Sequence, residues 1–348
     1  MTKLDVVKLK FETPLHIGNE REDYASGSTL LHSDALTAAI FFTWNRLGHP
    51  EWIPKNEHDD PGFIISSLFP YLTIEGKTAY FVPRPMISNR QNEKSTEDTS
   101  LRKQLKKIAW IDWDIFNLLR EGKQFENKRE NIIGAFQSVH NLNPEIVQDK
   151  MANNHFIDSD VYPRSKVSRF GKTDTEIFYI ERYYFKDNAG LYALVNYQNK
   201  EIEKRVQAAF KLLGEEGIGT DRNIGNGKFV PSFGEELRYP EIPGATFGIN
   251  LGLYCPKDKA EMESLPYDEK TGYDLIKRSG WLSEPYNTWR KRNVYMFKEG
   301  SCFKLSKDDL SNMPVTKGAL VDVRPSETYP SIEHPIWRSG KSIFIPCK

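Results

Sequence analysis

Apolar and polar residues alternate near the start of the chain, over residues 7–11 (Val-Lys-Leu-Lys-Phe). This period of two predicts a half-buried β-strand. A helix is expected next over residues 35–47, because large apolar side chains recur there at helical spacing; Ser33 is expected as its N-cap and Gly48 just past its end. Residues 78–82 (Thr-Ala-Tyr-Phe-Val) predict a second strand that ends at a proline.

A long, polar and irregular insertion is predicted over about residues 86–160. Within it, residues 100–107 indicate a short basic helix, and residues 132–139 indicate a short ordered element. A stretch of this length between core elements is usually functional or disordered.

Two β-rich runs, residues 177–185 and 191–197, flank a short turn that ends in glycine, which predicts a β-hairpin. An amphipathic helix follows, since apolar residues from Ile202 to Leu213 recur on one helical face. A glycine-rich loop and a strand at residues 228–233 complete the unit. This order of elements is that of a ferredoxin-like fold with a large excursion in its middle.

A second unit begins after a proline- and glycine-punctuated linker at residues 239–244. Residues 247–253 alternate strictly and predict a strand, and residues 273–280 are predicted to form a short helix. Further strands are expected at residues 294–297, 319–323 and 342–345.

The length of 348 residues also favours two domains. We therefore predict an α+β fold made of two ferredoxin-like (RRM-like) domains. The first comprises residues 1–238 and carries the insertion, and the second comprises residues 239–348.

The charge balance narrows the possible partners. The formal net charge is zero and the isoelectric point is about 7.1, so nucleic-acid binding would have to come from local basic patches. The three cysteines are not spaced as zinc ligands, which indicates a reducing compartment and no metal. There is no signal-peptide pattern and no apolar run near the roughly 20 residues that span a bilayer, so we expect a soluble cytoplasmic protein with no membrane partner and no cofactor.

The candidate chemistry is concentrated in the glycine loop, residues 214–228. Five glycines, at positions 214, 217, 219, 225 and 227, accompany Arg222 and Lys228. Backbone amides in such a loop can bind an anion, and the two cations suit a phosphate. The order helix–loop–strand excludes a dinucleotide fingerprint, and the spacing excludes a Walker A loop. A glycine-rich turn without a ligand remains the alternative.

Several short motifs, combined with this loop, resemble the RAMP superfamily of CRISPR-associated proteins. Within it, the chain is similar to the subunit group of type III-A (Csm) effector complexes that holds the 5′ tag of the guide RNA (crRNA). The motifs are Thr-Pro-Leu-His-Ile-Gly (13–18), Leu-His-Ser-Asp-Ala-Leu (31–36), the loop at 217–229, Ile-Lys-Arg-Ser-Gly-Trp (276–281), Met-Phe-Lys-Glu-Gly-Ser (296–301), Gly-Ala-Leu-Val-Asp-Val (318–323) and Arg-Ser-Gly-Lys-Ser-Ile-Phe (338–344).

The resemblance implies a non-catalytic subunit in antiviral defence that binds single-stranded RNA. It implies two protein partners, namely the large polymerase/cyclase subunit and the repeating backbone RAMP subunit, which this chain would bridge. It further implies that the insertion supplies a thumb-like hairpin that presses between nucleotides.

The RNA-binding residues expected on this basis come from four segments. The loop would bind the tag backbone through amides at four glycines, with two cations beside them. A basic strip before the predicted hairpin would add further contacts, with a solvated basic loop as its alternative. The complete set is His16, His32, Ser33, Arg164, Lys166, Arg169, Gly217, Gly219, Arg222, Gly225, Gly227 and Lys228.

Two other interpretations stay open. A second basic and aromatic cluster at residues 277–292 could contact RNA or a partner, or could be ordinary packing and surface charge. The alternative function is a metal-independent endoribonuclease that processes repeat RNA, with His16 or His32 as the general base. No second acid/base partner is evident for either histidine, so no catalytic residue is expected. An unrelated globular binding protein with a ligand-free turn is the third hypothesis.

Overall fold

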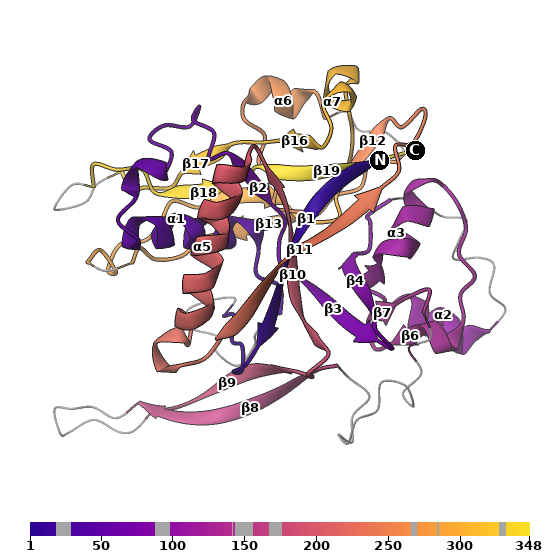
Figure 1. Cartoon of the computed structure of the whole chain (residues 1–348), viewed down its shortest axis with the longest axis horizontal. Helices are drawn as coiled ribbons and strands as arrows, with labels where there is room; N and C mark the ends of the chain where they lie inside the picture. The colour runs from indigo at the N-terminus through magenta and orange to yellow at the C-terminus, as the bar shows by residue number, and fades with distance from the viewer. Residues whose placement is uncertain are drawn as a thin grey trace.

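The protein, seen in a computed structural model, has a mixed α/β fold (Figure 1). The structure describes residues 1–18, 29–87, 98–140, 142, 156–166, 176–265, 270–283, 285–326 and 332–348. Within these ranges no helix combines the length and the apolar character that crossing a membrane requires.

A nine-stranded sheet forms the centre, in the order β11-β1-β10-β3-β4-β5-β7-β6, with β2 also paired to β10. Strand β1 lies between β10 and β11 and is antiparallel to both. It is buried on both faces, which is more burial than its alternating sequence predicts. The strands are β1 (Thr2–Phe11), β2 (Phe63–Ile65), β3 (Phe69–Ile74), β4 (Lys77–Pro83), β5 (Trp110–Asp112), β6 (Ile132–Ile133), β7 (Phe136–Gln137), β10 (Ala189–Tyr197) and β11 (Phe229–Tyr239).

Helices α1 (Ser33–Arg46) and α5 (Lys200–Glu216) pack beside one another on one face of this sheet (Figure 1). Both predicted helices are confirmed, as is Gly48, whose φ of +86° suits the turn after a helix. The predicted N-cap is wrong. His32 occupies the cap position without a side-chain cap bond, and Ser33 is the first helical residue, whose Oγ accepts the Leu253 amide at 2.9 Å.

The predicted hairpin of residues 177–185 and 191–197 is wrong, although both strands exist. Strand β9 (Glu176–Phe185) pairs with β8 (Ile157–Lys166), whereas β10 joins the central sheet. Both edges of β10 are occupied, one by β1 and the other by β2 and β3, so β9 has no edge of β10 with which to pair. The β8–β9 hairpin runs along the lower edge of the molecule and extends beyond the sheet (Figure 1).

The described part of the insertion is folded, so the prediction of an irregular stretch is wrong there. Helix α2 (Thr99–Leu105) confirms the short basic helix, and the β6–β7 pair confirms the ordered element. Helix α3 (Trp113–Arg120) was not predicted. Its Trp113 and Phe116 are buried against the central sheet, so apolar residues that are far apart in the sequence share one core.

The C-terminal part is built mainly from strands. Its sheet has the order β15-β12-β19-β16, and the pairs β13–β14 and β17–β18 flank it. The helix predicted over residues 273–280 is wrong, because residues 275–278 form strand β13, in which each residue pairs with β14. The elements are β12 (Phe247–Asn250), α6 (Lys259–Glu263), β13 (Leu275–Arg278), β14 (Val294–Phe297), β15 (Cys302–Lys304), α7 (Lys307–Ser311), β16 (Val315–Lys317), β17 (Leu320–Asp322), β18 (Trp337–Ser339) and β19 (Ser342–Cys347).

Candidate nucleic-acid interface

The glycine loop leaves α5, passes the end of β1 and enters β11, as predicted. Three backbone donors of the loop bind the segment that follows β1. The amide of Thr220 donates to the His16 carbonyl at 2.9 Å, and the amide of Gly227 donates to the Pro14 carbonyl at 2.8 Å. The Lys228 amide donates to Thr13 Oγ1 at 2.8 Å. The loop is therefore fastened to the molecule rather than suspended in solvent.

Close backbone packing explains why glycines occur here. A Cβ at Gly219 would lie 2.4 Å from the His16 carbonyl oxygen, and one at Gly227 would lie 1.9 Å from that of Ile218. Both residues have positive φ, +96° and +73°. Gly225 also has positive φ, but a Cβ there would meet nothing within 4 Å. The glycines thus serve the internal fit of the loop first.

Three of the four amides expected to face phosphate already have internal acceptors. Gly217 donates to Leu213 at 2.8 Å, Gly225 donates to Arg222 at 3.0 Å, and Gly227 donates to Pro14, in each case to the carbonyl. These three amides are therefore engaged within the protein, and their contact with phosphate stays a prediction. That leaves side chains as the main groups by which the loop can attract an anion.

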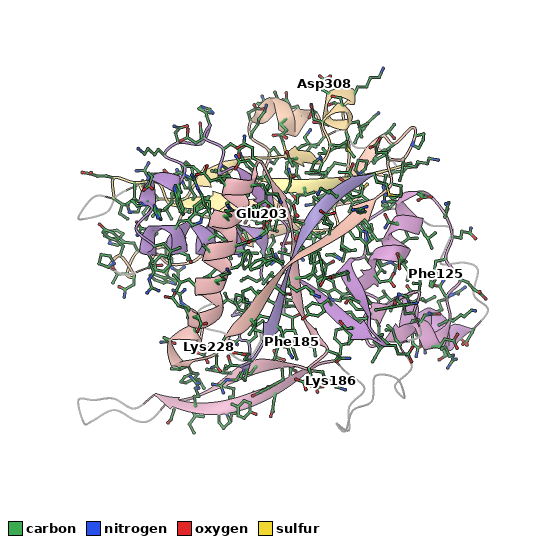
Figure 2. All side chains as sticks on the ribbon, viewed as in Figure 1. Phe125, Phe185, Lys186, Glu203, Lys228 and Asp308 are labelled. Carbon is green, nitrogen blue, oxygen red and sulfur yellow. The ribbon has the colours of Figure 1, made fainter. Side chains whose placement is uncertain are left out.

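Two cations stand on the outer side of the loop. Arg222 and Lys228 are both exposed, and Figure 2 labels Lys228 close to the β8–β9 hairpin. The Arg222 guanidinium lies 5.6 Å from the centroid of the Phe42 ring, which is itself 40% exposed. Within the described ranges neither cation has an acidic partner, so both charges face solvent.

The inner face of the hairpin is tied to the same loop. Asp221 Oδ2 lies 3.5 Å from Arg164 and 3.6 Å from Arg182. Arg182, which the sequence analysis did not single out, also lies 5.4 Å from the centroid of the Tyr162 ring. Two guanidinium groups meet one carboxylate, so this contact keeps a net positive charge. Of the other predicted strip residues, Lys166 ends β8, and Arg169 lies outside the described residues.

The opposite face of the hairpin carries three exposed apolar side chains. Val161, Ile177 and Tyr179 are 47%, 67% and 53% exposed. Because successive strand residues point to opposite faces, these three lie away from Arg164 and Arg182. The hairpin therefore carries Arg164 and Arg182 on one face and these three exposed apolar side chains on the other.

The two histidines proposed as RNA contacts or as bases are engaged inside the protein. His16 is 1% exposed, and its Nδ1 lies 2.6 Å from the Glu181 carbonyl oxygen. His32 Nδ1 lies 2.8 Å from Glu299, whose carboxylate also accepts a hydrogen bond from Ser67. Burial alone would raise the pKa of Glu299, but His32 and Ser67 hold it below its usual value. Both histidines thus help to join chain segments.

Three of the motifs meet in a buried clamp between the two parts of the chain. Asp34, at the start of α1, bonds Arg278 Nε at 3.0 Å and Nη2 at 3.1 Å, and it also bonds Arg338. Burial would raise the pKa of Asp34, yet the two guanidinium groups lower it to about 2. Ser33, expected to contact RNA, is 1% exposed and holds Leu253 in the same region. These motif residues fix the position of one part against the other.

The second basic and aromatic cluster is divided by this clamp. Arg278 belongs to the ion pair with Asp34, while the Arg290 guanidinium lies 4.7 Å from the centroid of the Trp281 ring. Lys291 is also close to the clamp, where burial and the charge of Arg338 lower its pKa. Part of this cluster is therefore structural.

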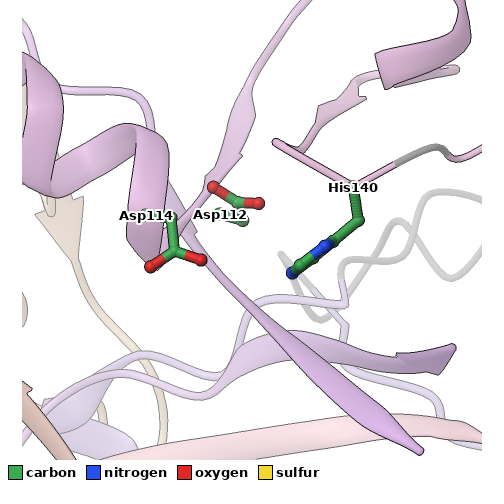
Figure 3. A group of neighbouring side chains, drawn as sticks. All are labelled: Asp112, Asp114 and His140. Carbon is green, nitrogen blue, oxygen red and sulfur yellow. The ribbon is translucent and has the colours of Figure 1, made fainter. Parts of the chain in front are cut away.

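One group of possible metal ligands escaped the sequence analysis. Asp112, Asp114 and His140 have ligand atoms within 4.8 Å of one another (Figure 3). Asp112 and Asp114 lie 28 and 26 residues before His140, so the group has no short sequence motif by which it could be recognised. Asp112 is already occupied, because it accepts hydrogen bonds from the amides of Ile115 and Val139, each at 2.8 Å, and from Ser138. Burial raises the pKa of Asp112, and its hydrogen bonds from Ser138, Ile115 and Val139 oppose this effect only in part.

Comparison with known proteins places this arrangement in a family. The family model described as the RAMP superfamily matches residues 8–230, and the model of the CRISPR Csm4 C-terminal domain matches residues 245–347. The chain is 23% identical to the CRISPR system Cms protein Csm4 of Methanocaldococcus jannaschii, over 99% of this chain and 97% of that one. It is 24% identical to the protein of the same name from Thermococcus onnurineus, over 70% of this chain and 71% of that one.

Solved structures show the same fold. The Csm3-Csm4 subcomplex of a type III-A CRISPR-Cas interference complex contains a chain with a TM-score of 0.64 at 21% identity, over 99% of both chains. The Csm1-Csm4 cassette in complex with pppApA contains one with a TM-score of 0.56 at 18% identity, over 99% of this chain and 97% of that chain.

Proposed function

The chain belongs to the RAMP superfamily, and we propose that it is the Csm4-type subunit of a type III-A CRISPR effector complex, where it anchors the 5′ tag of the crRNA. The observation that carries the proposal is the pair of exposed cations, Arg222 and Lys228, on a loop fastened to the end of β1. Single-stranded RNA is held by phosphate contacts and by stacking of splayed bases.

In this proposal the loop and the β8–β9 hairpin contact different parts of the RNA. The two cations neutralise tag phosphates, and the positive face of the hairpin, with Arg164 and Arg182, extends the same surface. The exposed Ile177 and Tyr179 on the other face can lie against bases. The part of a thumb that presses between nucleotides therefore falls to the β8–β9 hairpin and not to the insertion at 86–160.

The role is one of binding and assembly rather than catalysis. The burial of His16 and the engagement of His32 by Glu299 give no support to either histidine as a general base. The names of the related structures, which pair Csm4 proteins with Csm3 and with Csm1, support partners of two kinds for this chain. These are the repeating backbone RAMP subunit and the large polymerase/cyclase subunit, which this chain would bridge in the cytoplasm.

We also assign a ferredoxin-like plan to the two parts, divided near Tyr239, where β11 ends. The sheet order β11-β1-β10-β3, with α1 and α5 on one face, supports this plan for the first part. The antiparallel sheet β15-β12-β19-β16 supports it for the second, although α6 and α7 have only five residues each.

The test is the salt dependence of RNA binding. The Arg222→Ala/Lys228→Ala variant of the chain, reconstituted with its large-subunit partner, is titrated with a tag-bearing guide RNA at several salt concentrations. Loss of two phosphate contacts should flatten the slope of log K against log salt by about 1.4 and lower affinity roughly tenfold near 0.15 M salt. The RNA should remain uncut.

Lys304→Ala/Lys307→Ala is the matched control, since it removes the same charge from two exposed residues of the second part that pair with no acidic residue in the described ranges. Figure 2 labels Asp308, the neighbour of Lys307, at the end of the molecule opposite to Lys228. Equal slopes for the loop variant and the control would remove the loop from the binding site.

A further inference from the structure

We propose that the insertion carries a second nucleotide-binding site, a pocket between α2, α3 and β5 that takes one nucleoside phosphate unit of a single-stranded RNA. The cavity has a volume of about 90 Å³. Its lining contains apolar side chains, three cations and three side-chain amides, and no acidic residue. That combination is specific enough to name a ligand class.

The apolar wall of the pocket suits a planar ring. Ile115 and Leu119 come from α3, Ile111 comes from β5, and Phe125 follows α3 and is half-buried. Ile111 and Ile115 belong to the core against the central sheet, so this wall is held in place. A base laid against such a surface gains stacking contact that does not depend on its identity.

The positive charge around the pocket suits an anionic ligand. Arg84, Arg102 and Lys106 line it, all three are exposed, and none has an acidic partner within the described ranges. Asp98, four residues before Arg102, pairs with Arg129 at 2.7 Å, and Glu126, which stands between the lining residues Phe125 and Asn127, pairs with Lys128 at 3.4 Å. Arg84 is held in position, because its Nη1 donates to the Leu105 carbonyl at 3.1 Å.

The amides at the pocket favour a nucleotide over an acidic peptide. Gln124, Asn127 and Gln137 line it, and Gln137 Nε2 donates to Asn127 Oδ1 at 2.7 Å, which fixes the pair. Oriented amides can hydrogen-bond the edge of a base, while the cations take its phosphate. An acidic peptide would satisfy the cations but would leave the apolar wall uncovered.

This site is separate from the glycine loop. Figure 2 labels Phe125 beside α2 and α3 on one flank of the central sheet, and Lys228 on the other flank. The inference therefore does not depend on the function proposed for the loop, and the two can fail independently.

The experiment compares two double variants that each remove two positive charges from α2 and the two residues that follow it. Arg102→Ala/Lys106→Ala removes two lining cations, whereas Lys103→Ala/Lys107→Ala removes two exposed lysines of the same segment that do not line the pocket. Both are made in the full chain carrying Arg222→Ala/Lys228→Ala, so that the loop does not mask the result. The probe is a fluorescein-labelled 12-nucleotide single-stranded RNA, measured by anisotropy.

We expect Arg102→Ala/Lys106→Ala to bind the RNA roughly tenfold more weakly, as the loss of two phosphate contacts near 0.15 M salt would produce. The affinity of the control, Lys103→Ala/Lys107→Ala, should change less than twofold. Phe125→Leu, which keeps the packing but removes the ring, should weaken binding severalfold. Adding the RNA should slow amide hydrogen exchange in residues 119–127 of the parent chain.

Each alternative outcome is decisive. Equal affinities for the two double variants, or no exchange protection at 119–127, would overturn the proposal. Displacement of the RNA by AMP at millimolar concentration would identify a free nucleotide as the ligand of the same pocket. Loss of large-subunit binding in the lining variant, with RNA affinity unchanged, would overturn the RNA site in favour of a protein contact.

Discussion

Replacing Asp34 by asparagine should destabilise the protein more than any change to its exposed ion pairs. Asp34 is 1% exposed and faces Arg278 and Arg338, the latter only 7% exposed. Removing one member of a buried ionic group leaves the other charges uncompensated, which costs about 3–5 kcal/mol. Equilibrium denaturation by urea measures the loss, and Asp274→Asn is the control, because its pair with Lys298 is exposed and worth at most about 1 kcal/mol.

The pH dependence of that loss gives a second, independent magnitude. The pKa of Asp34 falls from an ordinary 3.8 to about 2 in the folded protein. A lowered pKa means that the carboxylate contributes stability above pH 4 and that this contribution, about 2 kcal/mol, disappears as the pH falls from 4 towards 2. The difference in unfolding free energy between the wild type and Asp34→Asn should therefore be constant above pH 5 and shrink below pH 4.

Two results would refute this reasoning. A cost below 1 kcal/mol for Asp34→Asn at pH 7 would mean that the clamp is solvated, and a difference that does not change between pH 5 and 3 would mean that Asp34 is not ionised by its arginine partners. Adding Arg338→Met to Asp34→Asn should recover part of the stability, since it removes one uncompensated charge.

Three further outcomes follow from the same contacts. Glu299→Gln should destabilise the protein by about 1–3 kcal/mol in thermal melts. Because folding lowers the pKa of Glu299, this cost should decrease as the pH falls below the ordinary glutamate value of 4.5. A cost that stays the same at low pH would contradict this expectation. Gly227→Ala should lower the free energy of unfolding, measured with urea, more than Gly225→Ala does. Both sites carry the roughly 1 kcal/mol strain of positive φ, but of the two only Gly227 would place its new Cβ against a carbonyl oxygen, that of Ile218. Equal losses would show that the loop backbone shifts to relieve the contact. Phe116→Ala should cost about 3–5 kcal/mol and speed hydrogen exchange throughout α3, whereas a loose insertion would tolerate it.

Local periodicity predicted the elements whose burial follows a simple pattern. The stripe from Ile202 to Leu213 became α5, and the order of helix, glycine loop and strand was confirmed. These features depend on residues close together in sequence, so a pattern suffices to find them. The two cations of the loop, Arg222 and Lys228, could be selected in the same way, and their role in RNA binding stays a prediction.

Pairing partners and converging contacts could not be predicted in that way. The runs that form β9 and β10 both predict strands, but their pairing partners, β8 for β9 and β1, β2 and β3 for β10, lie elsewhere in the sequence. The insertion was underestimated because Trp113 and Phe116 are isolated in a polar stretch, although they share one core. The motif that contains Asp34 contributes to the family resemblance, but Arg278 and Arg338, the arginines that pair with Asp34, lie more than 240 residues away in the sequence.

Photo-crosslinking can show directly whether the glycine loop and the β8–β9 hairpin hold the crRNA tag. A guide RNA with 4-thiouridine placed only in its 5′ tag is bound to the assembled complex, irradiated, and mapped on this chain by mass spectrometry. We expect crosslinked peptides from residues 217–230 or 157–185, and we expect these crosslinks to be lost in Arg222→Ala/Lys228→Ala and retained in Lys304→Ala/Lys307→Ala. Crosslinks confined to other segments, or to other subunits alone, would contradict it.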